Sequence, residues 1–157
     1  MRARVISWNS HDGKRSRTTL AMSAHGNPVL IDSSFYITLL QAKTDPLRWL
    51  EDRCSGVYDY DFATCGIVWM EVLRGRSDPR LRDRFERFFQ TSIFLNPTPA
   101  TWERAARIAW GLDRAGAVIP TTDIAIAACA LEHDMPVLTF DKHFAKIPGL
   151  VALDTLP

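Results

Sequence analysis

The sequence predicts an α/β domain whose sheet is mostly parallel. From Pro28 onward, short apolar runs alternate with longer segments of helical periodicity, an order typical of parallel strands joined by helices. The chain has 157 residues, of which 46% are hydrophobic, so its size and composition suit one domain with a substantial core. We find no internal repeat and no sign of a second domain, and assign residues 28–157 to this fold.

Five short segments have the composition of strands. Each is apolar, and turn-forming residues lie close to most of their ends. They are residues 29–31, 60–65, 92–95, 136–140 and 150–153. Together they predict a central five-stranded parallel sheet.

Helical segments connect these strands. They cover residues 33–41, a helix opened by Asp45 and Pro46, and residues 66–74, 79–89, 100–115 and about 121–131. Asp45 is a suitable N-cap, Pro46 fits the first helical position, and Gly75 ends the third helix. For the last helix, Thr121 or Thr122 is the expected cap.

One helix places a tryptophan on its expected buried face. In residues 100–115, Trp102 shares a face with Ala105, Ala109 and Leu112, so we predict that it packs in the core. The helix over residues 79–89 is amphipathic, with Arg80, Arg84 and Arg87 beside its apolar stripe. These arginines either contact RNA phosphates or belong to a solvated face with ion pairs at i, i+4 spacing.

Residues 1–27 are expected to form a disordered N-terminal arm, because they are polar and show no sustained apolar period. Residues 1–21 hold five Lys or Arg and one acid, Asp12. This composition superficially resembles a transit peptide and also suits an RNA-binding arm, but a simpler reading is that Met22 is the true start. The remaining residues carry 14 basic and 17 acidic side chains, so bulk charge does not favour RNA.

Neither a membrane span nor a disulfide framework is indicated. The longest apolar stretch, residues 124–131, is too short to cross a bilayer as a helix. The three cysteines, Cys54, Cys65 and Cys129, have neither paired nor metal-ligand spacing. A reducing cytoplasm fits this composition best.

Two acids follow predicted strands. Asp32 closes the strand over residues 29–31, and Asp141 closes the strand over residues 136–140. In a parallel sheet both carboxylates lie at the carboxyl edge, where open α/β sheets place their binding sites. Asp123 begins the helix that leads into the second of these strands, and Glu71 lies on the helix after residues 60–65. We therefore expect four carboxylates from distant segments to converge.

Four convergent carboxylates favour a divalent cation, because like charges at short range otherwise destabilise the fold. Oxygen donors without His or Cys ligands indicate Mg²⁺ or Mn²⁺ rather than Zn²⁺. Such an ion lowers the pKa of bound water and neutralises charge on a phosphodiester. Singly, each acid also has a structural alternative: Asp32 and Asp123 as helix N-terminal residues, Glu71 as a solvated residue and Asp141 as a turn residue.

These acids lie within motifs that resemble the PIN-domain family. The motifs are Val29-Leu30-Ile31-Asp32-Ser33-Ser34, Glu71-Val72-Leu73-Arg74-Gly75, Thr122-Asp123-Ile124-Ala125-Ile126-Ala127-Ala128 and Leu138-Thr139-Phe140-Asp141-Lys142-His143-Phe144. Their order and spacing match the family over residues 28–154, and the last two motifs are the most specific.

The resemblance implies a PIN-like fold with a five-stranded parallel sheet between helices and an acidic metal site. It also implies single-strand-directed RNA cleavage that leaves 5′-phosphate and 3′-hydroxyl ends. Asp32, Glu71 and Asp123 match the three main acids of the family, and Asp141 matches a fourth. Ser33 and Thr139 either order metal-bound water or act as cap and strand residues. His133 and His143 are assigned no catalytic role.

The function expected from this resemblance is that of a VapC-type toxin, a metal-dependent ribonuclease that a VapB-like antitoxin inhibits. We expect the antitoxin on a groove around Phe35, Leu39, Leu47 and Trp49, and a homodimer formed through the helix that begins near Ala100. A housekeeping RNA-processing nuclease and a noncatalytic PIN-fold binding module are the alternatives. A phosphoacceptor receiver domain fits less well, because Asp32 is followed by Ser33 and Ser34 rather than by a second acid.

Overall fold

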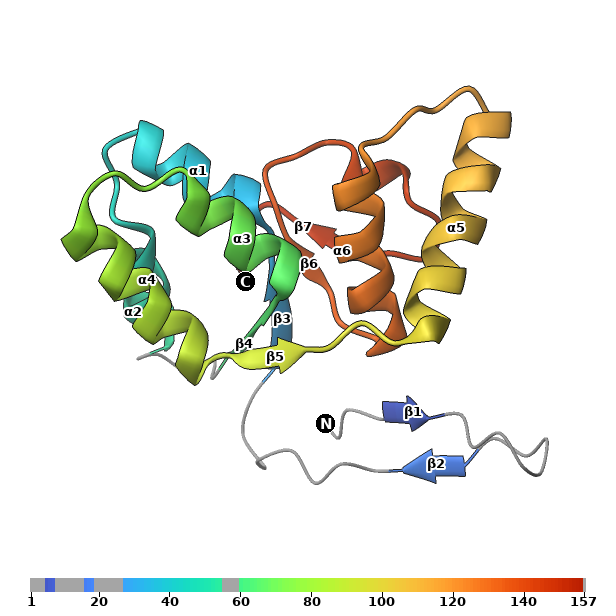
Figure 1. Ribbon diagram of the computed structural model, residues 1–157, viewed down its shortest axis with the longest axis horizontal. Helices are drawn as coiled ribbons and strands as arrows, with labels where there is room; N and C mark the ends of the chain where they lie inside the picture. Colours follow the sequence, from blue (N-terminus) through green and yellow to red (C-terminus); the bar gives the residue numbers. More distant parts are fainter. Residues whose placement is uncertain (1–4, 8–15, 19–26, 55–59, 157) are drawn as a thin grey trace.

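A computed structural model describes residues 5–7, 16–18, 27–54 and 60–156. Its main sheet has five parallel strands in the order β5-β4-β3-β6-β7. Figure 1 shows α1 to α4 gathered on one side of this sheet and α5 and α6 on the other. The predicted α/β fold with a central five-stranded parallel sheet is confirmed.

Strands and helices alternate as the sequence predicts, with small shifts at their ends. In chain order they are β3 Asn27–Ile31, α1 Ser33–Gln41, α2 Pro46–Cys54, β4 Tyr60–Cys65, α3 Gly66–Arg74, α4 Pro79–Thr91, β5 Ile93–Leu95, α5 Pro99–Arg114, α6 Thr121–Glu132, β6 Val137–Leu138, a short 3₁₀ turn η1 Phe144–Lys146, and β7 Ala152–Leu153.

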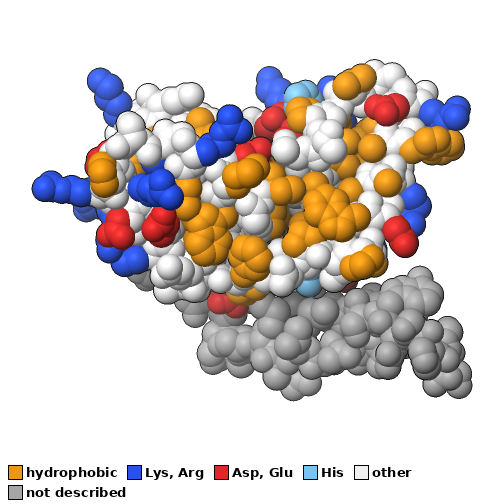
Figure 2. Space-filling view, viewed as in Figure 1, with side chains coloured by type: hydrophobic (Ala, Val, Ile, Leu, Met, Phe, Trp, Pro, Cys, Tyr) orange, Lys and Arg blue, Asp and Glu red, His pale blue; other side chains and the backbone are white. Residues whose placement is uncertain are grey.

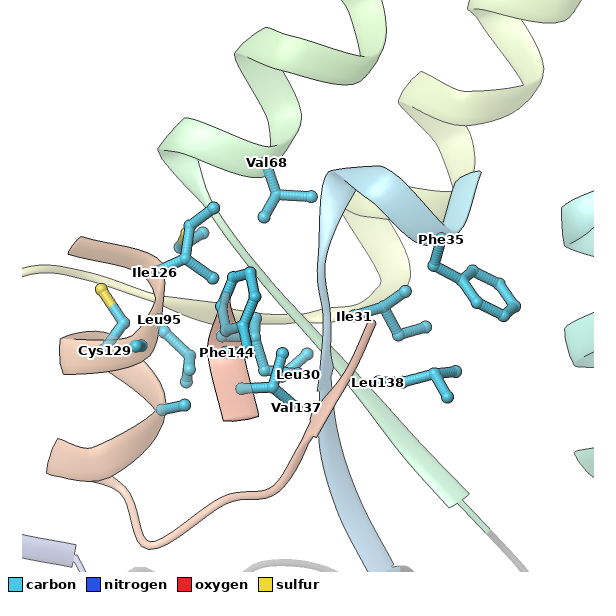
Figure 3. Packing of buried hydrophobic residues seen from close by; sticks show 14 of the residues in the cluster. Leu30, Ile31, Phe35, Val68, Leu95, Ile126, Cys129, Val137, Leu138 and Phe144 are labelled. Atoms are coloured by element: carbon cyan, nitrogen blue, oxygen red, sulfur yellow. The ribbon is translucent and has the colours of Figure 1, made fainter. Parts of the chain in front are cut away.

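The register of the two central strands decides where the site lies. Leu30 of β3 pairs with Val137 of β6, and Ile31 pairs with Leu138. Successive side chains in a strand point to opposite faces. In Figure 3, Leu30 and Val137 accordingly lie on the α6 side, whereas Ile31 and Leu138 lie on the side of Phe35. The next residues, Asp32 and Thr139, therefore leave the sheet together, toward α6.

The hydrophobic core lies on both faces of the sheet, and the residues around α6 are among the most deeply buried. Figure 3 shows side chains from β3, β5, β6, α3, α6 and η1 meeting there, with Phe144 among them. Residues 124–130 of α6 are all buried, because the helix lies against the sheet, α5 and α3. The apolar run that was too short for a membrane span is thus a buried helix. Among the described residues, no helix is both long and apolar enough to span a membrane.

Capping side chains fix where several helices begin. The carboxylate of Asp32 accepts a hydrogen bond from Ser34 N at the start of α1, and Asp78 does the same for Arg80 N at the start of α4. Thr98 and Thr101 form a capping box at the start of α5. The prediction for α6 was wrong: Thr121 is already helical, and Pro120 occupies the cap position without a side-chain hydrogen bond.

Two further expectations were wrong. The predicted strand over residues 136–140 is paired only at Val137–Leu138, because Thr139 and Phe140 turn away to build the loop that carries Asp141. Trp102 is 51% exposed rather than buried. Ala105 and Leu112 of the predicted stripe are buried, but Thr101 takes the buried position in place of Trp102.

Two short strands precede the main sheet. β1 Val5–Ser7 and β2 Ser16–Thr18 pair in an antiparallel manner. The first strand of the main sheet, β3, begins at Asn27, one residue before the predicted start of the folded domain at residue 28. Most of the segment predicted to be a disordered arm lies outside the described residues, so that expectation stays a prediction.

Candidate active site

The predicted acids come from segments around the point where the strand order reverses. The chain runs from β3 to β4 and β5 in one direction, then returns across the sheet to β6 and β7. At such a reversal the connections leave in opposite directions and open a crevice above the strand ends. Asp32 leaves the carboxyl end of β3, and Asp141 follows β6, its neighbour. The main-chain N–H of Asp32 donates to Leu138 O at 3.0 Å, which ties the two ends together.

Asp32 is buried directly after the carboxyl end of β3, with only 2% of its surface exposed. Its Oδ2 atom accepts hydrogen bonds from Ser34 N at 3.1 Å and from Thr139 Oγ1 at 3.0 Å. Burial raises the pKa of Asp32, and the hydrogen bonds from Ser34 and Thr139 oppose that rise. Donors on both sides therefore fix the carboxylate in place.

The hydroxyl groups of Ser34 and Thr139 form a series of hydrogen bonds that ends at Asp32. The Thr139 hydroxyl donates to Asp32, so the 3.0 Å contact between Ser34 Oγ and Thr139 Oγ1 places the hydrogen on Ser34. Ser34 Oγ in turn accepts from Phe140 N at 3.2 Å, and Thr139 Oγ1 accepts from Asp141 N at 2.9 Å. The loop that carries Asp141 is thus built on the same hydroxyls that orient Asp32.

Glu71 reaches the site from α3. Ser33 is only 8% exposed, and its Oγ atom donates a hydrogen bond to Glu71 Oε2 at 2.7 Å. This hydrogen bond connects Glu71 to the residue that follows Asp32. Ser33 therefore orients the Glu71 carboxylate, in addition to any role at the start of α1.

Asp123 and Asp141 meet beside a histidine. One ligand atom each from Asp123, Asp141 and His143 lie within 4.8 Å of one another. His143 Nδ1 is 3.1 Å from Asp141 Oδ1 and 3.5 Å from Asp123 Oδ2. Within the part of the chain that is described, His143 Nδ1 and Asp123 Oδ2 are both buried atoms without a geometrically satisfied hydrogen bond. Such groups are costly to leave unpaired.

Electrostatic repulsion links all four predicted acids. Burial raises the pKa of Asp123 to about 6, with repulsion from Asp141, Asp32 and Glu71 adding to the rise and His143 opposing it. Each of the other three carboxylates therefore lies close enough to influence Asp123. The structure brings all four sequence-predicted acids near one another, and among the described residues Asp123 and Asp141, with His143, lie close enough to share one cation.

The donor set fits a divalent cation. Asp123 Oδ2 is buried without a hydrogen-bond donor among the described residues, and the carboxylates around it repel one another. A bound cation stabilises such an arrangement, and oxygen donors suit Mg²⁺ and Mn²⁺. The imidazole of His143 extends the predicted donor set, and Mn²⁺ accepts such a mixed set more readily than Mg²⁺ does.

Sequence reasoning left out two contributors. His143 was assigned no role, although it lies two residues after Asp141 on the same loop; the turn in which His143 N donates to Asp141 Oδ1 at 2.8 Å folds its ring back toward the acids. Ser34 was treated only as a neighbour of Asp32, yet its hydroxyl connects Phe140 to Thr139. The shared signal in both cases was proximity in sequence to a predicted acid.

Comparisons with known proteins agree with this arrangement. The family model of the PIN domain matches residues 29–150. A search of curated proteins found no match. Among solved structures, VapBC2 from Rickettsia felis bound to a promoter DNA fragment has a chain 17% identical, with a TM-score of 0.66 and coverage of 80% of this chain and 97% of that one.

Two further structures show the same fold. A toxin-antitoxin complex from Klebsiella pneumoniae has a chain 25% identical over 78% of this chain and 95% of its own, with a TM-score of 0.60. VapC20 from Mycobacterium tuberculosis, described as a toxin that cleaves the sarcin-ricin loop, is 18% identical over 82% of this chain and 99% of its own, with a TM-score of 0.59.

Proposed function

Because the chain belongs to the PIN-domain family, we propose that it is a VapC-type toxin, an endoribonuclease that depends on Mg²⁺ or Mn²⁺. PIN domains are a family of nucleases. The observation that carries the proposal is the proximity of Asp32, Glu71, Asp123 and Asp141, with Asp123 Oδ2 buried and without a hydrogen-bond donor among the described residues. The solved VapBC complexes with this fold support the toxin assignment.

In this proposal Asp32, Glu71 and Asp123 hold the cation, and Asp141 acts as the fourth acid. The cation, when bound, supplies positive charge that neutralises the phosphodiester and favours ionisation of the attacking water. Ser34 and Thr139 keep Asp32 oriented, and Ser33 does the same for Glu71. His143 adds an imidazole nitrogen beside Asp123 and Asp141, where it extends the donor set for the cation. The products carry 5′-phosphate and 3′-hydroxyl ends.

The direct test is RNA cleavage by the purified protein with Mg²⁺, with Mn²⁺ and with EDTA. We expect cleavage only with a divalent cation, and none by Asp123→Asn. Asp113→Asn is the matched control, because Asp113 is an exposed acid on α5, outside the acid cluster. Equal cleavage by the wild-type protein and Asp123→Asn contradicts the site assignment. An intact fold without any cleavage favours a noncatalytic binding module.

An antitoxin is the proposed protein partner, as in the solved toxin-antitoxin complexes. The groove expected for it needs correction: Phe35 is 0% and Leu47 is 4% exposed, so both belong mainly to the core. A pocket of about 380 Å³ opens nearby between α2 and α4, and its lining includes Leu47, Arg84 and Phe88. We place an apolar face of the partner there.

Co-expression distinguishes a toxin from a housekeeping nuclease. In the cytoplasm, the proposed location, the protein expressed alone should arrest growth, and the product of the neighbouring gene should relieve the arrest and block cleavage in vitro. A harmless protein that binds no neighbouring product but cleaves RNA is the outcome expected of an RNA-processing enzyme.

A homodimer is the second proposed assembly, formed through the exposed side of α5. Trp102 is 51% exposed and Trp110 is 63% exposed, with Met70 of α3 and Phe94 of β5 also exposed. Figure 2 shows apolar side chains gathered over this face of the molecule. Large exposed apolar patches mark interaction surfaces. Sedimentation should give a dimer for the wild-type protein and a monomer for Trp102→Glu; a wild-type monomer contradicts the assignment.

A further inference from the structure

A recess lies beside the acid cluster of Asp32, Glu71, Asp123 and Asp141, over the carboxyl ends of β6 and β7. It has a volume of about 460 Å³. Its lining residues are Thr139, Phe140, Asp141, Lys142, Ala145, Ala152, Leu153 and Asp154. Thr139 bonds to Asp32, and Asp141 belongs to the acid cluster, so the recess continues directly from the proposed cleavage site. We call it the β7 pocket.

The β7 pocket combines an aromatic surface with opposite charges. Phe140 is 37% exposed, while its ring stacks on buried Phe35 with centroids 5.3 Å apart and planes 29° apart. Lys142 and Asp154 are both exposed. Within the described part of the chain, neither of them forms a side-chain hydrogen bond or an ion pair. A rigid ring, a free cation and a free carboxylate therefore line one recess.

These features match the parts of one nucleotide. Aromatic side chains stack bases of single-stranded nucleic acid, and a lysine attracts the phosphate. A carboxylate accepts hydrogen bonds but donates none, so it selects bases that present N–H groups on their pairing edge. Guanine presents two adjacent N–H donors there, whereas uracil presents one. A pocket of this size is appropriate for one base with its ribose.

From this arrangement we propose that the β7 pocket binds the nucleotide next to the cleaved phosphate and favours guanosine. The inference rests on the proposed function, because the acid cluster sets which phosphate is cut. In it, Phe140 stacks the base, Asp154 accepts its N–H groups, and Lys142 neutralises the adjoining phosphate. The pocket thereby contributes sequence preference, which the acid cluster itself cannot supply, since phosphates are the same at every position.

The first test measures nucleotide binding without cleavage. Guanosine 5′-monophosphate and uridine 5′-monophosphate are titrated in Mg²⁺ into the wild-type protein, Asp154→Asn and Asp134→Asn, with NMR shifts as readout. We expect the wild-type protein to bind the guanosine nucleotide at least about fivefold more tightly, with shifts at Phe140 and Asp154. Asp154→Asn should lose this preference. Asp134→Asn should keep it, because Asp134 is an exposed acid before β6, at the opposite edge of the sheet.

The second test sequences the ends produced from a random RNA pool. When the three proteins are compared at an equal extent of RNA cleavage, guanosine should be enriched beside the cut for the wild-type protein and for Asp134→Asn, and not for Asp154→Asn. Phe140→Leu, which keeps apolar packing on Phe35 but removes the stacking face, should weaken binding of both nucleotides.

The two tests separate failure of this inference from failure of the proposed function. Equal affinity for the two nucleotides, or a preference that survives in Asp154→Asn, overturns the assignment of the β7 pocket even when cleavage is normal. A preference for guanosine 5′-monophosphate without any RNA cleavage upholds the pocket and contradicts the nuclease.

Discussion

Helix α4 and the carboxyl edge of the sheet both carry several charged side chains, but three arginines of α4 pair with carboxylates, whereas the acids of the sheet edge lie mainly against one another. Arg82 pairs with Glu86, and Arg87 pairs with Asp83, both at the i, i+4 spacing that the sequence suggested. Arg84 pairs with Asp45 at the start of α2. At the sheet edge, the other three acids all repel Asp123, and His143 opposes that repulsion.

The arginines of α4 have partners within the fold, whereas the acids of the sheet edge need a bound ligand to balance their charge. Exposed ion pairs on α4 contribute little to stability and require nothing further. Burial and the neighbouring acids raise the pKa of Asp123, and its Oδ2 atom is buried without a hydrogen-bond donor among the described residues, which disfavours the folded state until a cation binds. Among the interpretations offered for the arginines, the solvated, ion-paired face is therefore the better supported for Arg82, Arg84 and Arg87.

The largest expected effect is on Asp123. Asp123→Asn should reduce RNA cleavage by about 100-fold or more, because a metal contributes several kcal/mol to the reaction and this variant removes a ligand charge. Its fold should remain intact, since the amide is the same size. Initial rates on a fluorescent RNA measure the loss, and circular dichroism checks the fold. Retention of most of the activity would falsify the role of Asp123.

Asp141→Asn is expected to have a milder effect, a loss of about 10- to 100-fold, because we expect the fourth acid to act through water. Asp141 is also partly exposed, unlike Asp32. Rates measured over a range of Mn²⁺ concentrations should show that much of the loss is recovered at high metal. A loss as complete as that of Asp123→Asn places Asp141 among the primary ligands instead.

Thr139→Val tests whether orientation of Asp32 matters apart from its charge. The substitution keeps the shape of the side chain but removes the hydroxyl that donates to Asp32 and accepts from Asp141 N. We expect a loss of stability of about 1 to 3 kcal/mol and about a tenfold weaker affinity for the metal. Urea unfolding and metal titration measure the two quantities. Thr139→Ser should restore both, and failure to do so points to packing as the cause.

Stability of the metal-free protein should depend on pH through Asp123. Its folded pKa, about 6, lies above the ordinary value of 3.8, so its stabilising contribution is present below pH 4 and is lost as pH rises through 6. In EDTA, Asp123→Asn should be more stable than the wild-type protein at pH 7.5, by on the order of 2 kcal/mol. The gap should narrow to a minor part of that value near pH 4.5, and added Mg²⁺ should narrow it at pH 7.5. An equal gap at both pH values rules out ionisation of Asp123 as its cause.

The smallest effect is expected on α4. Arg87→Ala should change the free energy of unfolding by less than about 1 kcal/mol, because its pair with Asp83 is exposed. RNA cleavage should stay within about twofold of the wild-type rate at low and high salt. A large fall in RNA affinity at low salt would show that α4 contacts phosphates after all.

Much of the fold was predictable because local chemistry determined it. Pro46, Gly75 and Pro79 mark helix ends that the structure reproduces closely, and alternating apolar runs located all five strands of the main sheet. Errors arose where tertiary contacts outweigh local pattern. Trp102 fits a helical stripe, but Thr101 takes the buried position because it completes the capping box of α5 and donates to Glu132 of α6.

The candidate site divides in the same way. The sequence by itself determined that Asp32 and Asp141 follow strands, that Glu71 and Asp123 lie on neighbouring helices, and that all four stand within PIN-like motifs. It did not determine their mutual distances, because these depend on β3 and β6 being neighbours and on the register that pairs Ile31 with Leu138. Only the tertiary structure placed His143 against Asp123 and brought the Ser34 hydroxyl to Thr139. Both contacts join residues far apart in the chain, and no periodicity encodes them, since they arise when the β6 loop turns back over the end of β3.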